Sequence, residues 1–321
     1  MLFDDVIHFL TAHQTWVVVT IALVLERLIR IPAAYHPRQL LQAFAHRLRH
    51  KVHFPHRQDP QQQKISGALA TCITLVVWVP LPMIIVELSE FPILTQAVVL
   101  MMCLQWRNMA RQMLQIATLE EAPQKQLRRT LLGHWLARDC DSLSSLGIHK
   151  GAIEGIYLRS WHTQLAPIFW FCIGGIGAAL IYQVLWEVSQ CWHPRHQDKS
   201  YFGWFAKKSR SLVDWLPEIV WGMWLLLSGV GQRSGLVLKD GARFTSLPRG
   251  ILIAAASQRL RINMGGPALY NQVKYKRPRI HSVSEPSARN IVNALSHTSF
   301  HITMVCGLIW LLVLIKWIWL L

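Results

Sequence analysis

The chain has 321 residues, of which 52% are hydrophobic and 16% are charged, and its formal net charge is +16. Soluble domains carry about 25% charged residues, so this composition excludes an ordinary soluble protein and favours a membrane protein. Nucleic acid or an anionic membrane surface could attract the positive charge. The basic residues lie between apolar runs, and no zinc-finger spacing occurs, so we expect membrane lipids as partners and no nucleic acid.

Six apolar runs are candidates for membrane-spanning helices, which need about 20 residues each. In chain order they are Val6–Leu25, Ile65–Val86, Phe91–Leu104, Leu165–Leu185, Trp215–Val230 and Ile302–Leu321. Pro80 and Pro82 should kink the second run or end it early. The first run lacks a basic leader and a small-residue cleavage site, so we expect it to remain as an anchor. The sequence therefore predicts an all-α, polytopic integral membrane protein with a single membrane domain over residues 1–321 and basic helical cytoplasmic loops.

The distribution of Lys and Arg predicts the orientation of these helices. Residues 27–64, 107–138 and 233–289 are rich in both, which places them in the cytoplasm. The N-terminus and the acidic turn at Glu87 and Glu90 should then lie outside. We expect a multi-pass protein of the cell inner membrane.

One loop contradicts this arrangement. A single crossing by Leu165–Leu185 would leave a basic segment outside, with Arg195, Lys199, Lys207, Lys208 and Arg210. Two segments that enter the membrane and return on the same side would remove the conflict. Gly174–Gly175 and Pro217 are the candidate breakpoints, because irregular backbone survives at membrane depth only where protein or water lines it. The sequence leaves single crossings and re-entrant segments open.

Helical spacing of apolar residues predicts three further helices, at Gln39–Arg49, Glu120–Trp135 and Gly250–Leu260. The first is amphipathic and lies either on the membrane surface or against other helices. We find no β-hairpin signal. The six cysteines include no CxxC pair and are typical of small buried hydrophobic residues.

The strongest acidic constellation is Arg138, Asp139 and Glu154. In an ATP-using membrane enzyme, the carboxylates would hold Mg²⁺ or act as acid and base, and the arginine would face phosphate. The alternative is an ordinary surface pair of Arg138 and Asp139 that caps a helix. A second candidate is Gly265–Gly266, which is either an anion-binding turn or a turn that ends a helix.

Closely spaced histidines suggest a metal site less strongly. They are His46, His50, His53 and His56. Zinc sites use such spacing, but Pro55 interrupts any helix here and basic residues surround the histidines. We interpret them as a solvated face and expect no structural metal.

Ordered sequence blocks resemble a known family over most of the chain. The blocks are Glu26-Arg27-Leu28 with Pro32 and His36-Pro37; Arg138-Asp139 with Ala152-Ile153-Glu154; Ala166 to Trp170 with Gly174-Gly175 and Tyr182; Phe202-Gly203 with Asp214-Trp215-Leu216-Pro217; and Gly265-Gly266-Pro267 with Tyr270. In this order they resemble the CbiB/CobD family of adenosylcobinamide-phosphate synthases, membrane enzymes of cobalamin biosynthesis to which the AmpE branch is related.

The resemblance implies a ligase that joins a corrinoid, adenosylcobyric acid, to aminopropanol phosphate through an amide bond, with ATP and Mg²⁺. It implies catalytic roles for Arg138, Asp139 and Glu154, with Mg²⁺ on Asp139 and Glu154. It implies substrate-binding roles for a further set of residues: His36, Gly174, Gly175, Gly265, Gly266 and Tyr270. The oligomeric state is open, and a homo-oligomer is compatible with the sequence.

Several positions depart from the family pattern. Gln183, Trp186 and Ser189 stand where the family has an arginine, an asparagine and an aspartate, and Arg210 and Ser211 stand where it has two aspartates. If those carboxylates bind Mg²⁺ and ATP in the family, this chain has lost much of that set. The rival hypothesis is therefore a non-catalytic, AmpE-like membrane regulator or scaffold that retains the fold.

Overall fold

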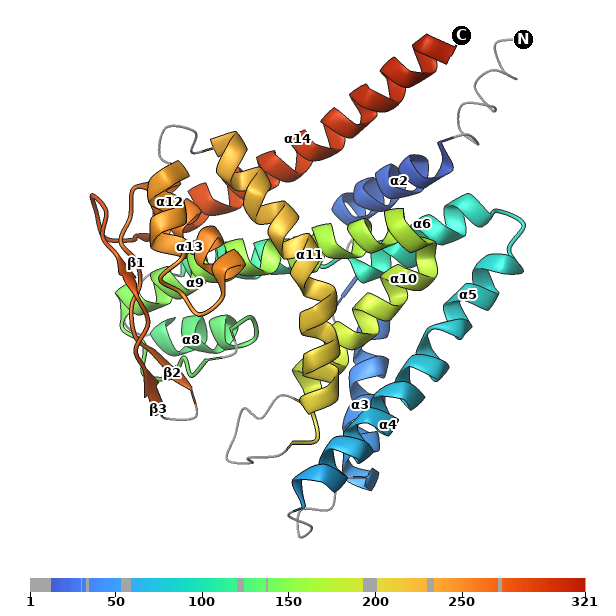
Figure 1. Ribbon diagram of the computed structural model, residues 1–321, viewed down its shortest axis with the longest axis horizontal. Coiled ribbons are helices and arrows are strands. Elements are labelled where there is room, and N and C mark those ends of the chain that lie inside the picture. The colour runs from blue at the N-terminus through green and yellow to red at the C-terminus, as the bar shows by residue number, and fades with distance from the viewer. Residues whose placement is uncertain are drawn as a thin grey trace.

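The computed structural model describes residues 13–29, 31–32, 35–52, 59–119, 124–136, 138–192, 201–229, 234–270 and 273–320 (Figure 1). The helices are α2 (Gln14–Leu28), α3 (Pro37–Val52), α4 (Pro60–Trp78), α5 (Pro80–Glu87), α6 (Pro92–Cys103), α7 (Trp106–Thr118), α8 (Lys125–Gly133), α9 (Ser145–Ser160), α10 (Ala166–Cys191), α11 (Trp204–Gly229), α12 (Ser234–Gly241), α13 (Leu247–Leu260) and α14 (Ala288–Leu320), with a π-helical turn, Trp161–Leu165, between α9 and α10. The predicted all-α fold is confirmed.

The expectation of no β-hairpin is wrong. Strand β2 (Ala268–Tyr270) pairs antiparallel with β3 (Val273–Tyr275), and β1 (Met264–Gly265) pairs antiparallel with β4 (Arg279–Ile280). Both pairs are too short to show a hydrophobic alternation that a sequence pattern could reveal. They form a ribbon beside α8 and α9 (Figure 1).

By length and composition, three segments of the described chain could cross a membrane: Pro60–Glu87, Ser145–Cys191 and Ala288–Ile315. They contain or overlap the predicted spans Ile65–Val86, Leu165–Leu185 and Ile302–Leu321. The predicted spans Phe91–Leu104 and Trp215–Val230 correspond to α6 and to the second half of α11, which are not among the three. Helix α6 has 12 residues and so reaches only about 18 Å. Much of Val6–Leu25 lies outside the described residues.

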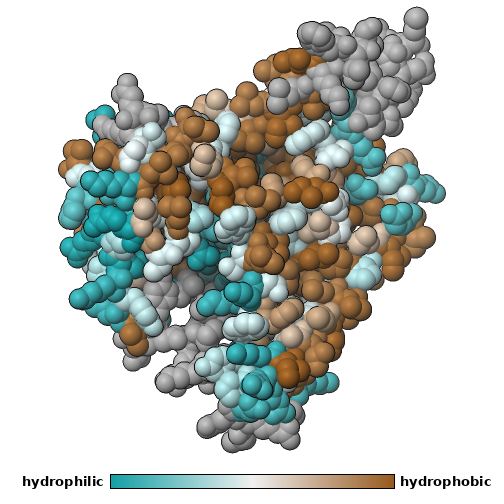
Figure 2. Space-filling view, viewed as in Figure 1, coloured by the Kyte–Doolittle hydropathy of each residue, from teal (hydrophilic) through white to brown (hydrophobic). Residues whose placement is uncertain are grey.

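Exposed apolar side chains mark the surface that lipid would cover. On α4, Ile65, Leu69, Ile73 and Val76 recur at helical spacing and are exposed, whereas the opposite face with Ala70 is buried. Figure 2 shows apolar surface over much of the part of the molecule that contains α5 and α14, and hydrophilic surface on the side of the β ribbon. This division is expected for a helical bundle in a membrane with a polar lobe outside the lipid.

The helices predicted from periodicity are present. Helix α3 contains the predicted Gln39–Arg49 and contacts α4 and α10, so the structure supports packing on other helices. Helix α13 contains Gly250–Leu260. Helix α8, Lys125–Gly133, covers most of the described part of Glu120–Trp135. Helix α4 ends at Trp78 and α5 begins at Pro80, which confirms the predicted interruption.

Helix α10 doubles back at Gly174 and Gly175. Gly175 has φ 65° and ψ −161°, a conformation that is essentially restricted to glycine. Beyond it, the ring of Trp186 lies 4.1 Å from the ring of His162, although a straight helix over this interval would be about 36 Å long. Figure 1 shows the two halves of α10 meeting at a sharp angle.

This reversal favours the re-entrant alternative for Leu165–Leu185. Within the predicted span, the limb before the bend, Leu165 to Gly174, is about 15 Å long, shorter than the about 30 Å of a bilayer core. The second candidate breakpoint was wrong, since α11 continues through Pro217 as a helix.

Replacing Gly175 with alanine should destabilise the protein, because the added Cβ strains this backbone conformation. We expect a loss of about 1–3 kcal/mol, measured as a lower apparent melting temperature in detergent micelles. Gly307→Ala in α14 is the matched control, since no atom lies within 4 Å of its added Cβ. Equal stability of the two variants would contradict the strained bend.

The reversal also predicts the side on which the chain emerges after α10. In a cysteine-free background, Ser145→Cys at the start of α9 and Lys208→Cys in α11 should react with a membrane-impermeant thiol reagent from the same side of the membrane. Glu90→Cys, in the turn before α6, should react from the opposite side. All three positions are exposed. Labelling of positions 145 and 208 from opposite sides would exclude the re-entrant arrangement.

Candidate functional site

One cavity in the described part of the chain has a volume of about 280 Å³ and is lined mainly by charged side chains. We name it the arginine cavity. Its cationic residues are Arg138, Arg159, Lys207, Arg210, Arg249 and Arg277. Its carboxylates are Glu154, Asp214 and Glu218. Six cations against three carboxylates make this cavity suited to an anionic ligand.

One wall is built around Glu154, which α9 buries. Nη1 of Arg138 lies 3.2 Å from one carboxylate oxygen, and Nη2 of Arg277 donates a hydrogen bond to the other. Arg138 follows α8, and Arg277 follows β3. The β ribbon thus brings to the site an arginine more than a hundred residues away from Glu154 in the sequence. Charge-assisted pairs of this kind fix both partners in position.

Asp139 does not join Arg138 and Glu154 at the arginine cavity. Its backbone N–H donates to the carbonyl of Leu269 in β2, at 3.0 Å. It is not among the residues that line the arginine cavity. The structure therefore brings Arg138 and Glu154 together and uses the backbone of Asp139 to attach the ribbon. The catalytic and metal roles of the three stay predictions.

The opposite wall is built around Asp214 of α11, which is 1% exposed. Nε of Arg210 lies 2.9 Å from one carboxylate oxygen, and the hydroxyl of Tyr182 donates to the other at 3.1 Å. Nδ1 of His162 lies 3.4 Å from that second oxygen. Burial alone would raise the pKa of Asp214, but His162 and Arg210 lower it to about 2.

The π-helical turn explains how His162 reaches this wall. Such a turn adds a residue to the helical repeat and rotates the side chains that follow, and it is often found at functional sites. The rings of Trp161 and Trp186 pack against His162, at centroid distances of 4.4 and 4.1 Å.

Trp186 also organises two cations of the cavity. The guanidinium carbons of Arg210 and Arg159 lie 4.2 and 4.8 Å from the centre of its ring. Cation–π contacts hold a guanidinium group in place without neutralising its charge. Trp186 therefore fixes the orientation of two guanidinium groups at the cavity.

Of the five departures from the family pattern, all except Gln183 lie at this cavity. Ser189, Arg210 and Ser211 line it, and Trp186 packs against its arginines. Nη1 of Arg210 lies 3.3 Å from the Ser189 hydroxyl. Positions where the family pattern has aspartates thus adjoin one another in space, and here one of them carries a guanidinium group.

The carboxylates of the arginine cavity do not fit a magnesium site. Each has an arginine partner: Arg138 and Arg277 for Glu154, Arg210 for Asp214, and Arg249, at 3.1 Å, for Glu218. Mg²⁺ requires carboxylate oxygens that face the ion. In the described residues, no group of three or more His, Cys, Asp or Glu side chains is placed to hold a metal ion.

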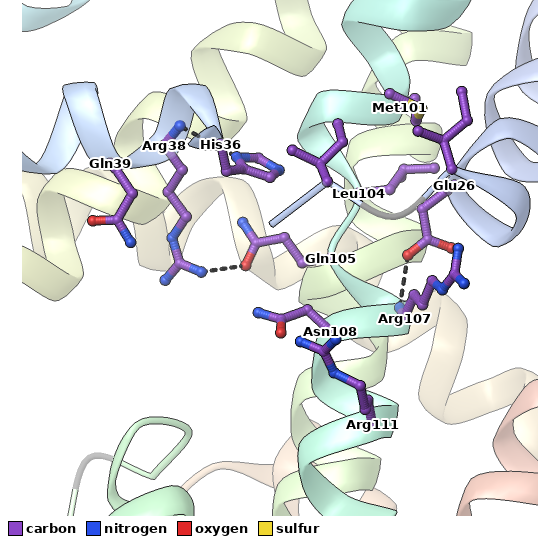
Figure 3. A pocket seen from close by; sticks show the side chains of 12 residues that line it. Glu26, His36, Arg38, Gln39, Met101, Leu104, Gln105, Arg107, Asn108 and Arg111 are labelled. Atoms are coloured by element: carbon purple, nitrogen blue, oxygen red, sulfur yellow. Dashed lines mark hydrogen bonds between the residues drawn. The ribbon is translucent and has the colours of Figure 1, made fainter. Parts of the chain in front are cut away.

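A second, smaller cavity of about 120 Å³ lies between the end of α2, the start of α3 and the junction of α6 and α7. We name it the Glu26 cavity. Figure 3 shows Glu26 and Arg107 on one side of it, and Arg38 and Gln39 on the other. His36, which the sequence assigned to substrate binding, lines this cavity.

One layer of residues separates the two cavities. Gln105 lines the Glu26 cavity, and its backbone N–H donates to the carbonyl of Thr163 at 2.8 Å. The neighbouring His162 lines the arginine cavity. The buried Glu187 reinforces the layer, since it accepts hydrogen bonds from Gln105 and Gln183, both at 3.1 Å.

The remaining predicted binding residues lie away from both cavities. Gly174 and Gly175 form the bend of α10. Gly265 and Gly266 have φ of 71° and 99° and pack against Pro278 and Arg279 beside β4. They do not end a helix, since α13 ends at Leu260. Tyr270 ends strand β2, and its side chain lies outside the described part of the structure.

Sequence comparison gives a consistent assignment. The family model described as CobD/Cbib protein matches residues 19–298. The chain is 26% identical to the cobalamin biosynthesis protein CobD of Stutzerimonas stutzeri over 307 residues, which cover 93% of this chain and 96% of that protein. It is 22% identical to the cobalamin biosynthesis protein CobD of Chromobacterium violaceum over 278 residues, 86% of this chain and 89% of that protein.

No solved structure matches this chain. The family model covers nearly all of the described helical bundle, including the residues that line both cavities. The chain therefore belongs to the CobD/CbiB family of membrane proteins of cobalamin biosynthesis.

Proposed function

We propose that this protein is an adenosylcobinamide-phosphate synthase of the cell inner membrane, crossing it several times. It would join the carboxyl group of adenosylcobyric acid to the amine of aminopropanol phosphate. The amide bond forms between the carboxyl carbon and the amine nitrogen. One carboxyl oxygen leaves with a phosphoryl group of ATP.

The observation that carries this proposal is the charge of the arginine cavity. Arg159, Lys207 and Arg210 line it together with the arginines that hold Glu154. A phosphate chain binds best where several guanidinium groups converge, because each can donate two parallel hydrogen bonds. ATP is the reactant with the largest concentrated negative charge, so we assign its phosphates to this cavity.

The residues of the cavity have separate tasks in this proposal. Arg138 and Arg277 would contact phosphate from the side of the β ribbon, and Glu154 would hold both guanidinium groups in position. Arg210, stacked on Trp186, would contact phosphate from the opposite wall. Because the cavity carboxylates do not fit Mg²⁺, no step in the proposal passes through a protein-bound metal ion.

A deletion strain that depends on cobinamide synthesis tests this function. Supplying the protein in trans should restore growth, and Glu154→Ala should lower the rate of amide formation by orders of magnitude, because it leaves two buried arginines unpaired and misplaced. Asp139→Ala tests the metal or acid–base role predicted for that residue in the same assay. Glu90→Ala, at an exposed position far from the cavity, is the control. Absence of rescue with the protein present in the membrane would refute catalysis.

The second candidate is a non-catalytic membrane regulator or scaffold. It is favoured by one observation: most positions that depart from the family pattern lie at the arginine cavity, and every carboxylate there is paired with an arginine. A scaffold would keep its phenotype when Glu154 or Asp139 is replaced, provided that the variant still folds.

The buried carboxylate of Asp214 makes the stability of the protein depend on pH, and this effect can be measured without an activity assay. Because its folded-state pKa of about 2 is below its ordinary value, its contribution to stability is complete above about pH 5 and is lost as the pH falls from about 4 towards 2. Asp214→Asn should remove this part of the pH dependence. At pH 7 it should cost about 3–5 kcal/mol, since a buried charge pair loses one partner. Thermal unfolding in detergent at several pH values measures both effects.

If Asp214→Asn retained the wild-type loss of stability below pH 4, another group would be responsible for it. Ser211→Ala, in the same helix and also at the cavity, is the control and should leave the pH dependence unchanged.

A further inference from the structure

The Glu26 cavity holds two buried polar atoms that have no hydrogen-bond partner and carry opposite charge. Glu26 is 6% exposed, and one carboxylate oxygen accepts the backbone N–H of Arg107 at 2.6 Å. Its other oxygen, Oε2, has no partner, and Nη1 of the Arg107 side chain has none either. A buried, unpaired charged group costs free energy, so both atoms favour a ligand that satisfies them.

One cation of this cavity is paired with a carboxylate outside the cavity lining, and two others are not. Arg38 lies 2.7 Å from the buried carboxylate of Glu187 and donates to Gln105, also at 2.7 Å, so its charge is balanced within the protein. Arg107 and Arg111 remain, one helical turn apart in α7, together with Glu26. Two available cations and one carboxylate leave an excess of one positive charge.

These features define the chemistry of the ligand. A cationic group would satisfy Oε2 of Glu26, and an anion would satisfy Arg107 and Arg111. A phosphate monoester carries about −1.5 to −2 at neutral pH, so an ammonium group linked to one has a net charge of about −0.5 to −1. This charge balances the excess in the cavity. The volume of about 120 Å³ restricts the ligand to a few non-hydrogen atoms.

The remaining polar groups of the cavity suit the phosphate. The backbone N–H of Arg38 donates to Nδ1 of His36 at 3.3 Å, so the neutral imidazole carries its proton on Nε2 and can donate it. Burial and then Arg38 lower the pKa of His36, which keeps the ring neutral near pH 7. Asn108, beside Arg111 in Figure 3, adds an amide donor.

We propose that the Glu26 cavity binds an aminoalkyl phosphate, with the ammonium group on Glu26 and the phosphate on Arg107 and Arg111. A free amino-alcohol phosphate has the net charge that balances the cavity. The headgroup of phosphatidylethanolamine also links an ammonium group to a phosphate, but its phosphodiester carries a single negative charge, so the charge of the cavity favours the free compound. If the ligand is the free compound, the cavity holds the amine substrate one residue layer away from the arginine cavity. That identification rests on the proposed function, whereas binding of the zwitterion does not.

Titration calorimetry on the full-length protein in phosphatidylglycerol nanodiscs tests the site without ATP or corrinoid. The probes are ethanolamine phosphate and ethyl phosphate, which lacks the ammonium group. We expect ethanolamine phosphate to bind at least tenfold more tightly. Glu26→Gln, which keeps the size of the side chain, should abolish that preference. The matched control Glu90→Gln should preserve it.

A second variant keeps the proposal testable if Glu26→Gln does not fold. Arg111 is exposed at the rim of the cavity, and Arg111→Gln should weaken both probes by a similar factor. Equal affinity of the wild type for both probes, or a preference that survives Glu26→Gln, would overturn the proposal. Lack of binding of either probe would overturn it as well.

Nanodiscs that contain phosphatidylethanolamine identify the source of the ligand. Competition with ethanolamine phosphate supports the site and assigns it to a lipid headgroup, whereas unchanged affinity supports it and assigns it to a soluble amino-alcohol phosphate. Loss of amide formation with intact binding would refute the proposed synthase activity and leave this site standing.

Discussion

The described polar lobe depends on the clamp of two guanidinium groups around the buried Glu154. One arginine comes from the segment after α8 and the other from the segment after β3, so a single carboxylate joins three parts of the chain that local structure would not bring together. Removing a buried charge from its partners costs more than the pair contributes as a whole. The clamp therefore fixes one wall of the arginine cavity.

The sequence predicted the elements whose signals are long or chemically distinctive. The break at Pro80 and the amphipathic helix around Leu41 were found because each depends on a local rule. Arg138 and Glu154 were singled out by charge next to an apolar run, and they are in contact. Arg277 was missed because it lies more than a hundred residues from Glu154, with no sequence pattern that links the two. Only the short β ribbon places them in contact. Strands of two or three residues carry no period that a pattern could detect.

The second wall could be predicted only in part. Asp214 stood in a sequence block that was recognised, but its partners Tyr182 and His162 were not connected with it. Their contact requires α10 to turn back, and the sequence left that alternative open. The π-helical turn that aims His162 has no sequence signature, since it depends on tertiary packing. In the Glu26 cavity, His36 alone was assigned a binding role, although Glu26 stood in a recognised block. The charged groups of this cavity come together only because the ends of α2 and α6 meet in the fold, and no local sequence pattern specifies that contact.

The reversal at Gly174 and Gly175 has a consequence for how the protein is made. A chain that crossed fully at this point would require the insertion machinery to translocate the basic segment that contains Lys207 and Lys208, at about 2.5–3.5 kcal/mol for each charge at the centre of the bilayer. A limb that returns to its own side removes that transfer. The glycine pair therefore allows biosynthesis to keep the basic segment that follows α10 on the ribosomal side of the membrane.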